Sequence, residues 1–87
     1  MLFDHELGHI ESREWRNEYQ IILDNGIRCK VFTDCVDEFG NWLVALEPRW
    51  LHTDEQAARA RTHARRIMQA FYDGLRYPNE GYVRQGT

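Results

Sequence analysis

The chain has 87 residues, a formal net charge of −3 at pH 7 and 43% hydrophobic residues. This length suits one domain with one hydrophobic core, and the apolar content is too high for a disordered segment. Because proteins that coat nucleic acids are usually strongly basic, the mildly acidic balance argues against that class.

The sequence also lacks the marks of a membrane or secreted protein. No apolar run approaches the roughly 18 residues of a membrane-spanning helix, and Asp4 and Glu6 interrupt any apolar signal sequence. Cys29 and Cys35 are the only cysteines, and two lone cysteines without a secretion signal are typical of reduced thiols. We therefore expect a cytoplasmic protein with no membrane partner.

The first motif in chain order is His5-Glu6-Leu7-Gly8-His9. It matches H-E-x-x-H, in which two histidines one helical turn apart bind zinc and the glutamate activates a water molecule. The string resembles the zinc-dependent metallopeptidases called zincins. That resemblance implies that His5 and His9 are zinc ligands and that Glu6 is the catalytic general base.

The rest of the sequence departs from that family. A catalytic zinc site needs a third protein ligand, and the extended zincin pattern is broken by Ser12 and Trp15. The structural alternative is a short N-terminal helix that buries Phe3, Leu7 and Ile10. We favour this alternative, with no metal, no cofactor and no enzymatic activity, and keep a minimal zinc hydrolase as the enzymatic alternative.

A mixed zinc site is a further possibility. His5, His9, Cys29 and Cys35 are suitable ligand types, although their spacing matches no known zinc pattern. Cys29 is otherwise expected to be a small core residue.

Three runs with the alternation of β-strands come next, at residues 19–23, 27–33 and 41–47. Asn25-Gly26 between the first two predicts a tight hairpin, with the positive φ angles of a type I′ turn. A second turn is expected at residues 37–40, and the last strand ends at Pro48, which has no backbone N–H to donate.

These strands carry apolar residues on both faces. One face can pack under a helix, but Ile22, Phe32, Leu43 and Ala45 point the other way. A sheet with one wet face would not need them. We expect the first 15 residues to cover this second face, with a second copy of the chain or a different protein as the alternatives. Phe32 and Leu43 are therefore candidate partner-binding residues.

The clearest element is a helix at about residues 53–74. Thr53 and Gln56 form a capping box at its start, and Gly74 is the expected C-terminal cap. Apolar residues recur along it at helical spacing: Ala57, Ala60, Ala64, Ile67, Met68, Phe71 and Leu75. The predicted fold is therefore α+β, a three-stranded antiparallel meander with a C-terminal amphipathic helix on one face. We expect one domain at residues 1–75 and a mobile tail at residues 76–87.

Two further features suggest binding. Arg59, Arg65 and Arg66 lie away from the apolar stripe and could make bidentate contacts to phosphates or to an acidic protein groove. The alternative is an ordinary solvated helix face. Trp50, just before the helix, is a candidate interface anchor or a lid over the end of the core.

The strand-strand-strand-helix order with an Ala-rich basic helix resembles the later part of a double-stranded-RNA-binding domain. That resemblance implies RNA binding through the arginine face of the helix. This helix, however, begins with Thr53-Asp54-Glu55-Gln56, where that family has a lysine cluster.

The small size, the acidic charge and the hairpin-plus-helix layout resemble the small inhibitors made by bacteriophages and mobile elements, including anti-CRISPR proteins. This resemblance implies a non-enzymatic inhibitor or accessory protein that docks on a larger bacterial complex, in the host-cell cytoplasm. We therefore predict a protein-binding module. A homodimer is a second arrangement, and an RNA- or DNA-binding domain is the alternative to protein binding.

Overall fold

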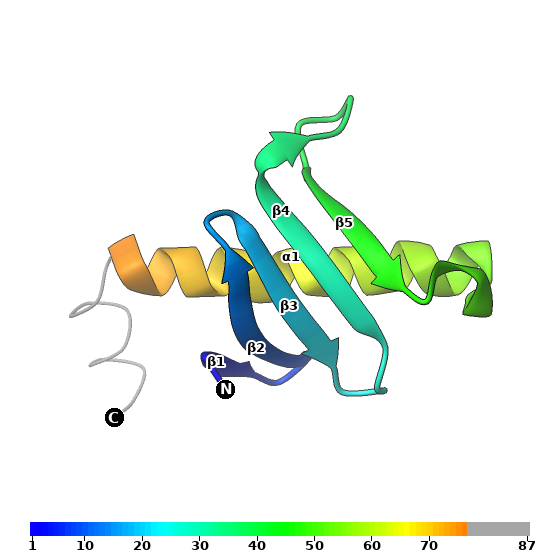
Figure 1. Ribbon diagram of the computed structural model, residues 1–87, viewed down its shortest axis with the longest axis horizontal. Helices are drawn as coiled ribbons and strands as arrows, with labels where there is room; N and C mark the ends of the chain where they lie inside the picture. Colours follow the sequence, from blue (N-terminus) through cyan, green and yellow to red (C-terminus); the bar gives the residue numbers. More distant parts are fainter. Residues whose placement is uncertain (77–87) are drawn as a thin grey trace.

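The structure, a computed structural model, describes residues 1–76, which form one sheet, a short 3-10 helix and one long α-helix. The elements are β1 (Phe3–His5), β2 (Gly8–Trp15), β3 (Glu18–Leu23), β4 (Arg28–Val36), β5 (Trp42–Glu47), η1 (Arg49–Leu51) and α1 (Asp54–Arg76). All strand pairs are antiparallel and follow chain order, so the sheet is a five-stranded meander (Figure 1). The α+β class, the meander and the C-terminal helix are confirmed.

The number of strands was predicted wrongly, because the first 15 residues extend the sheet. They form β1 and β2, neither a helix nor a cover over the second face. Phe3 and Ile10 pair across this hairpin, so a spacing that also fits a helical face belongs here to two facing strands. Register shifts on either side of residues 12–13 in β2 interrupt the alternation that would have revealed a strand.

Gly8 is the residue that allows β2 to start where it does. It is buried, has a φ of +151°, and would bring a Cβ to 2.7 Å from the Cα of Leu23 on β3. Any side chain at this position would therefore collide with the neighbouring strand and strain the backbone.

The β3–β4 and β4–β5 hairpins turn in the same way. Gly26 N donates to Leu23 O (2.8 Å), and Gly40 N donates to Asp37 O (3.0 Å). The two glycines have φ values of +91° and +82°, whereas no other type of residue has positive φ among residues 1–76. Each loop is therefore a three-residue type I turn closed by a left-handed glycine. The hairpin positions are confirmed, but the type I′ turn is not.

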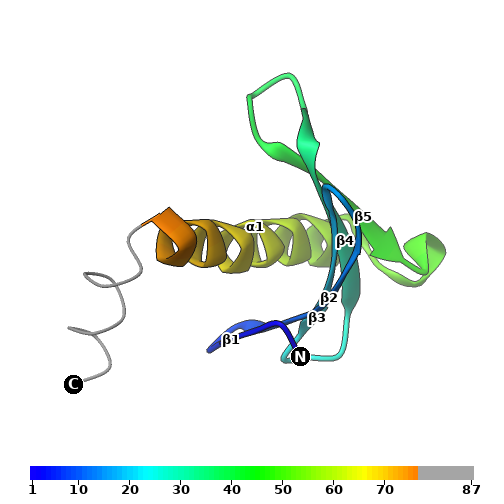
Figure 2. The ribbon, with the colours of Figure 1, turned by 60° about the vertical axis from the view of Figure 1, so that its left-hand side comes forward.

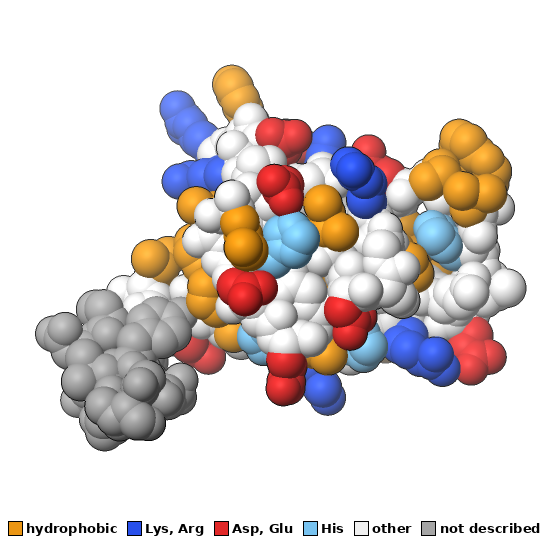
Figure 3. Space-filling model, turned by 90° about the horizontal axis from the view of Figure 1, so that it is seen from below, with side chains coloured by type: hydrophobic (Ala, Val, Ile, Leu, Met, Phe, Trp, Pro, Cys, Tyr) orange, Lys and Arg blue, Asp and Glu red, His pale blue; other side chains and the backbone are white. Residues whose placement is uncertain are grey.

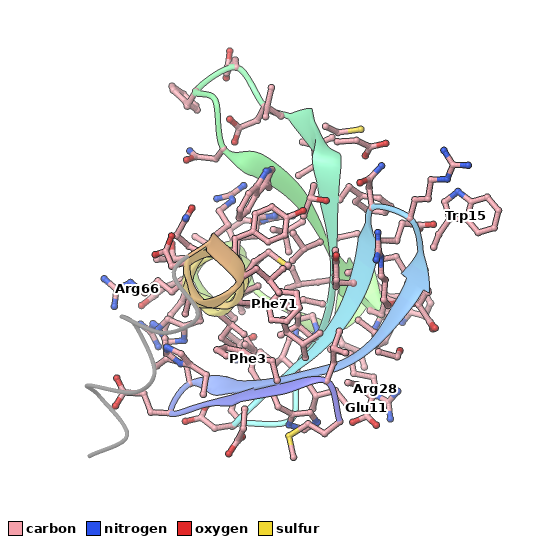
Figure 4. All side chains as sticks on the ribbon, turned by 90° about the vertical axis from the view of Figure 1, so that its left-hand side faces the viewer. Phe3, Glu11, Trp15, Arg28, Arg66 and Phe71 are labelled. Atoms are coloured by element: carbon pink, nitrogen blue, oxygen red, sulfur yellow. The ribbon has the colours of Figure 1, made fainter. Side chains whose placement is uncertain are left out.

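Helix α1 packs on one face of the sheet, and the sheet curves around it (Figures 2 and 4). The shared core is wholly apolar apart from the Tyr19 hydroxyl and the Cys29 thiol. The sheet contributes Ile10, Tyr19, Ile21, Leu23, Cys29, Val31, Val44 and Leu46, and the helix contributes Ala60, Ala64, Ile67 and Met68.

Both bonds of the predicted capping box are present. Gln56 N donates to Thr53 Oγ1 (3.1 Å), and Thr53 N donates to Gln56 Oε1 (3.0 Å). At the other end the helix runs through Gly74 to Arg76, so Gly74 is not its cap. A glycine inside a helix costs only about 1 kcal/mol relative to alanine, and packed aromatic residues hold this end of the helix to the sheet. The predicted tail lies outside the described residues, apart from Arg76.

Candidate docking surface

The His5–His9 string forms the β1–β2 hairpin. His5 pairs with Gly8 and His9 pairs with Asp4. Residues that pair directly share a face and successive residues alternate, so the two imidazoles lie on opposite faces of the sheet. His5 lies on the helix side, 6.5 Å from the Phe3 ring. The two histidines therefore cannot bind the same metal ion in this arrangement.

Each of these histidines has a local hydrogen bond. His5 Nδ1 accepts from Leu7 N (3.1 Å), and His9 Nε2 lies 2.8 Å from Glu11 Oε1. The bond to His9 is the main cause that lowers the pKa of Glu11 below its usual value. Glu6 is exposed in the turn. Among residues 1–76 no three His, Cys, Asp or Glu side chains gather into a group that could hold a metal.

The cysteines do not join these histidines. Cys29 is buried in the core, and burial raises the pKa of its thiol to about 11. Cys35 is exposed near the end of β4, where a hydrogen bond to Asp34 raises its pKa. The structure thus gives each cysteine a separate environment.

The three helix arginines predicted to bind a partner are also separated. Arg59 pairs with Glu55 one turn earlier (3.1 Å). Arg65 is turned toward the sheet, where its Nε donates to Trp42 O (2.8 Å) and its Nη2 lies 3.4 Å from Asp37 Oδ2. Arg66 is exposed and points away from the sheet (Figure 4). They do not form one continuous basic surface.

The inward-turned arginines have a structural role that the sequence reasoning missed. Arg61 Nε donates to Val44 O (3.3 Å), as Arg65 does to Trp42 O. Both carbonyls belong to β5, the edge strand of the sheet. Because open edges are templates for strand addition, these two side chains protect this edge. Their spacing of four residues on the helix was the available signal.

We call the sheet face opposite α1 the outer face, and no element among the described residues covers it (Figure 2). Its apolar residues are Ile22, Phe32, Leu43 and Ala45, the set that the alternation predicted to lie on this side. Phe32 pairs with both Glu18 and Leu43, and Lys30 pairs with Ala45. Leu43 is 41% exposed.

Trp15 enlarges the outer face at the end of β2, and sequence reasoning did not select it. It pairs with Glu18, is 69% exposed and points away from α1 (Figure 4). The charged neighbours on this face compensate each other, since Lys30 Nζ lies 4.0 Å from Glu18 Oε1. Apolar groups beside internally paired charges are suited to contact with another protein.

Trp50 lies at the end of the molecule where β5 leads into α1. It is 82% exposed and Leu51 is 65% exposed, so the interpretation of Trp50 as a core lid is wrong. Figure 3 shows hydrophobic side chains projecting at this end. A shallow hollow beside it is lined by Arg28, Leu46, Glu47, Pro48 and Trp50. Because Arg28 and Glu47 pair across β4 and β5, the hollow adjoins the outer face.

Comparison with known protein families, with curated proteins and with solved structures finds no match to this chain. Within residues 1–76, no helix combines the length and the apolar character needed to cross a membrane. Inference about function therefore depends on the geometry of this chain alone.

Proposed function

We propose that this protein is a non-enzymatic protein-binding module that docks on its partner through the outer face. The observation that carries the proposal is the position of the first 15 residues, which extend the sheet in its own plane. They leave Phe32 and Leu43 without a covering element among the described residues. A contiguous apolar patch on a small soluble domain usually marks an interaction site.

The layout of the surface supports docking. Its apolar centre lies on β4 and β5, and paired charges surround that centre. Trp15 and Trp50 lie near two of its margins and are largely exposed. Tryptophan is among the residues that contribute most to binding energy in interfaces.

The finer proposal is an inhibitor or accessory protein of the phage or mobile-element type, acting on a larger bacterial complex. A domain this small, with a core on one face of its sheet and apolar groups on the other, can act by occupying a surface. Such a role requires no chemistry at the docking site. The mechanism is steric, because the partner's own ligand and the outer face cannot use the same surface at once.

A photo-crosslinking experiment tests the docking surface. The crosslinking residue p-benzoylphenylalanine is placed at Leu43 on the outer face or, as a matched control, at the exposed Ala58 on the helix. After irradiation in bacterial lysate, the Leu43 position should give one dominant adduct, and the Ala58 position should not.

A second variant separates contact from chance proximity. Leu43→Asp places a charge at the centre of the patch, and it should abolish capture of the same partner while leaving the far-UV circular dichroism unchanged. Equal adducts from Leu43 and Ala58, or capture unaffected by Leu43→Asp, would contradict the proposal.

A further inference from the structure

The two tight turns of the sheet have the same backbone and very different side chains. In matched positions, the β3–β4 turn carries Asp24 and Asn25, and the β4–β5 turn carries Glu38 and Phe39. Asparagine is a usual turn residue and serves the first turn by accepting a hydrogen bond from Ile27 N (3.1 Å). The turn geometry therefore does not require an aromatic side chain at the tip.

Phe39 also contributes nothing to the hydrophobic core. It is 79% exposed and is not among the residues packed against the core cluster. Val36, on the same hairpin end, is 60% exposed. An exposed phenylalanine at a projecting tip is a contact group suited to a partner surface.

The hairpin end projects because β4 contains extra residues. Phe32 pairs with Leu43 and Val36 pairs with Trp42, so residues 33–35 have no counterpart on β5. An irregularity of this kind bends the strand and redirects the residues after it. Figures 1 and 2 show the end of this hairpin extending beyond the rest of the sheet.

This end is held in a defined conformation. Asp37 Oδ1 accepts hydrogen bonds from Phe39 N and Asn41 N, both at 2.9 Å. Its other oxygen lies 3.4 Å from Arg65 Nη2 on the helix, and the Trp42 ring packs edge-on against Tyr72 at 5.2 Å. Phe39 is thus presented by a preorganised turn, and preorganisation lowers the entropic cost of binding.

The charge of the hairpin end has one sign. Residues 33–41, which we call the acidic finger, contain Asp34, Asp37 and Glu38. No lysine or arginine occurs anywhere in residues 31–48. A nucleic-acid backbone would be repelled by this segment, whereas a surface rich in lysine and arginine would attract it.

From these observations we propose that the acidic finger inserts Phe39 into an apolar cleft on a protein partner whose rim carries lysine or arginine. The inference rests on the proposed function in taking the partner to be a protein, and it adds a second contact element with its own chemistry. The finger lies beyond the outer face, so the two contacts can be tested separately.

The test uses the full chain with p-benzoylphenylalanine at Phe39, a conservative aromatic replacement, irradiated in bacterial lysate beside the Leu43 and Ala58 versions. The expected adduct maps by mass spectrometry to a partner peptide that contains lysine or arginine next to apolar residues. Its yield should fall steeply from about 0.1 M to about 1 M salt, where the screening length shrinks from about 10 Å to about 3 Å.

Charge reversal at matched turn positions provides the second measurement. In the Phe39-labelled chain, Glu38→Lys should reduce the adduct about tenfold or more, because like charges facing across an interface are strongly unfavourable. Asp24→Lys, at the equivalent position of the other turn, should leave it unchanged.

The outcomes separate this inference from the proposed function. An adduct from Leu43 without one from Phe39 would overturn the finger contact and leave outer-face docking standing. An adduct that maps to an acidic surface, or that ignores both salt and Glu38→Lys, would also overturn it. Failure of both positions to react would overturn both proposals.

Discussion

The two faces of the sheet differ in what covers them, although neighbouring residues supply both. Ile21 points to the helix and is fully buried, whereas the next residue, Ile22, belongs to the outer face. The inner face is closed by α1, and the outer face keeps Phe32 and Leu43 without a cover among the described residues. One amphipathic helix shields one face only, so apolar residues on the other face are available for binding rather than needed for stability.

The largest contrast is expected in the free energy of unfolding. Ile21→Ala removes methyl groups from a fully buried site and should cost about 2–5 kcal/mol. Leu43→Ala on the outer face should change stability by about 0.5 kcal/mol or less. Urea denaturation followed by circular dichroism measures both, and an equal loss for the two variants would show that the outer face is covered in solution.

The next effect concerns the hairpin that keeps the N-terminal segment in the plane of the sheet. Gly8→Ala should destabilise the protein by about 1–3 kcal/mol, because the new Cβ meets β3 and the backbone conformation disfavours a side chain. Gly26→Ala is the control, since its Cβ would meet no atom within 4 Å. Thermal unfolding compares them, and the strain of positive φ at Gly26 predicts a smaller loss there. A larger loss at Gly26 would contradict the close packing assigned to Gly8.

A smaller effect separates the arginine that faces the sheet from the one that does not. Arg65→Ala removes hydrogen bonds to the edge strand and to the acidic finger, and should cost about 1 kcal/mol. Arg66→Ala should be within about 0.5 kcal/mol of the parent. Sedimentation velocity of the Arg65 variant should also show more self-association through the exposed edge. Equal stability of the two variants would contradict the structural role of Arg65.

The last difference appears only at alkaline pH and contrasts the two thiols. Because burial raises the pKa of Cys29 to about 11 from an ordinary 9.0, the unfolded chain loses this proton before the folded protein does. The stabilising contribution is complete below pH 9.0 and is lost as pH rises toward about 11. Cys29→Ala should flatten the stability curve over this window, and Cys35→Ala should not.

Thiol labelling at pH 8 gives an independent measure of the same contrast. Exposed Cys35 should react with a disulfide reagent directly, whereas Cys29 should react only through unfolding. Simultaneous labelling of both cysteines in the native protein would show that the inner face is open.

Much of the fold could be predicted where local signals are strong. The Thr53–Gln56 capping box and the Asn25-Gly26 turn depend on neighbouring residues, so a short stretch of sequence contains the whole interaction. The candidate site was predicted less fully. The alternation selected Phe32 and Leu43, but neither Trp15 nor Phe39, because bulges and turns break the regular period on which that reasoning depends.

The sequence alone determined the amphipathic helix, two hairpin positions and the apolar character of both sheet faces, because each depends on residues close together in the chain. Tertiary structure decided what those elements meet. It paired Phe3 with Ile10 across a hairpin, placed His5 and His9 on opposite faces, and turned Arg65 onto the edge strand. These outcomes depend on contacts between distant segments, and the same local pattern is compatible with several partners until the whole chain has packed.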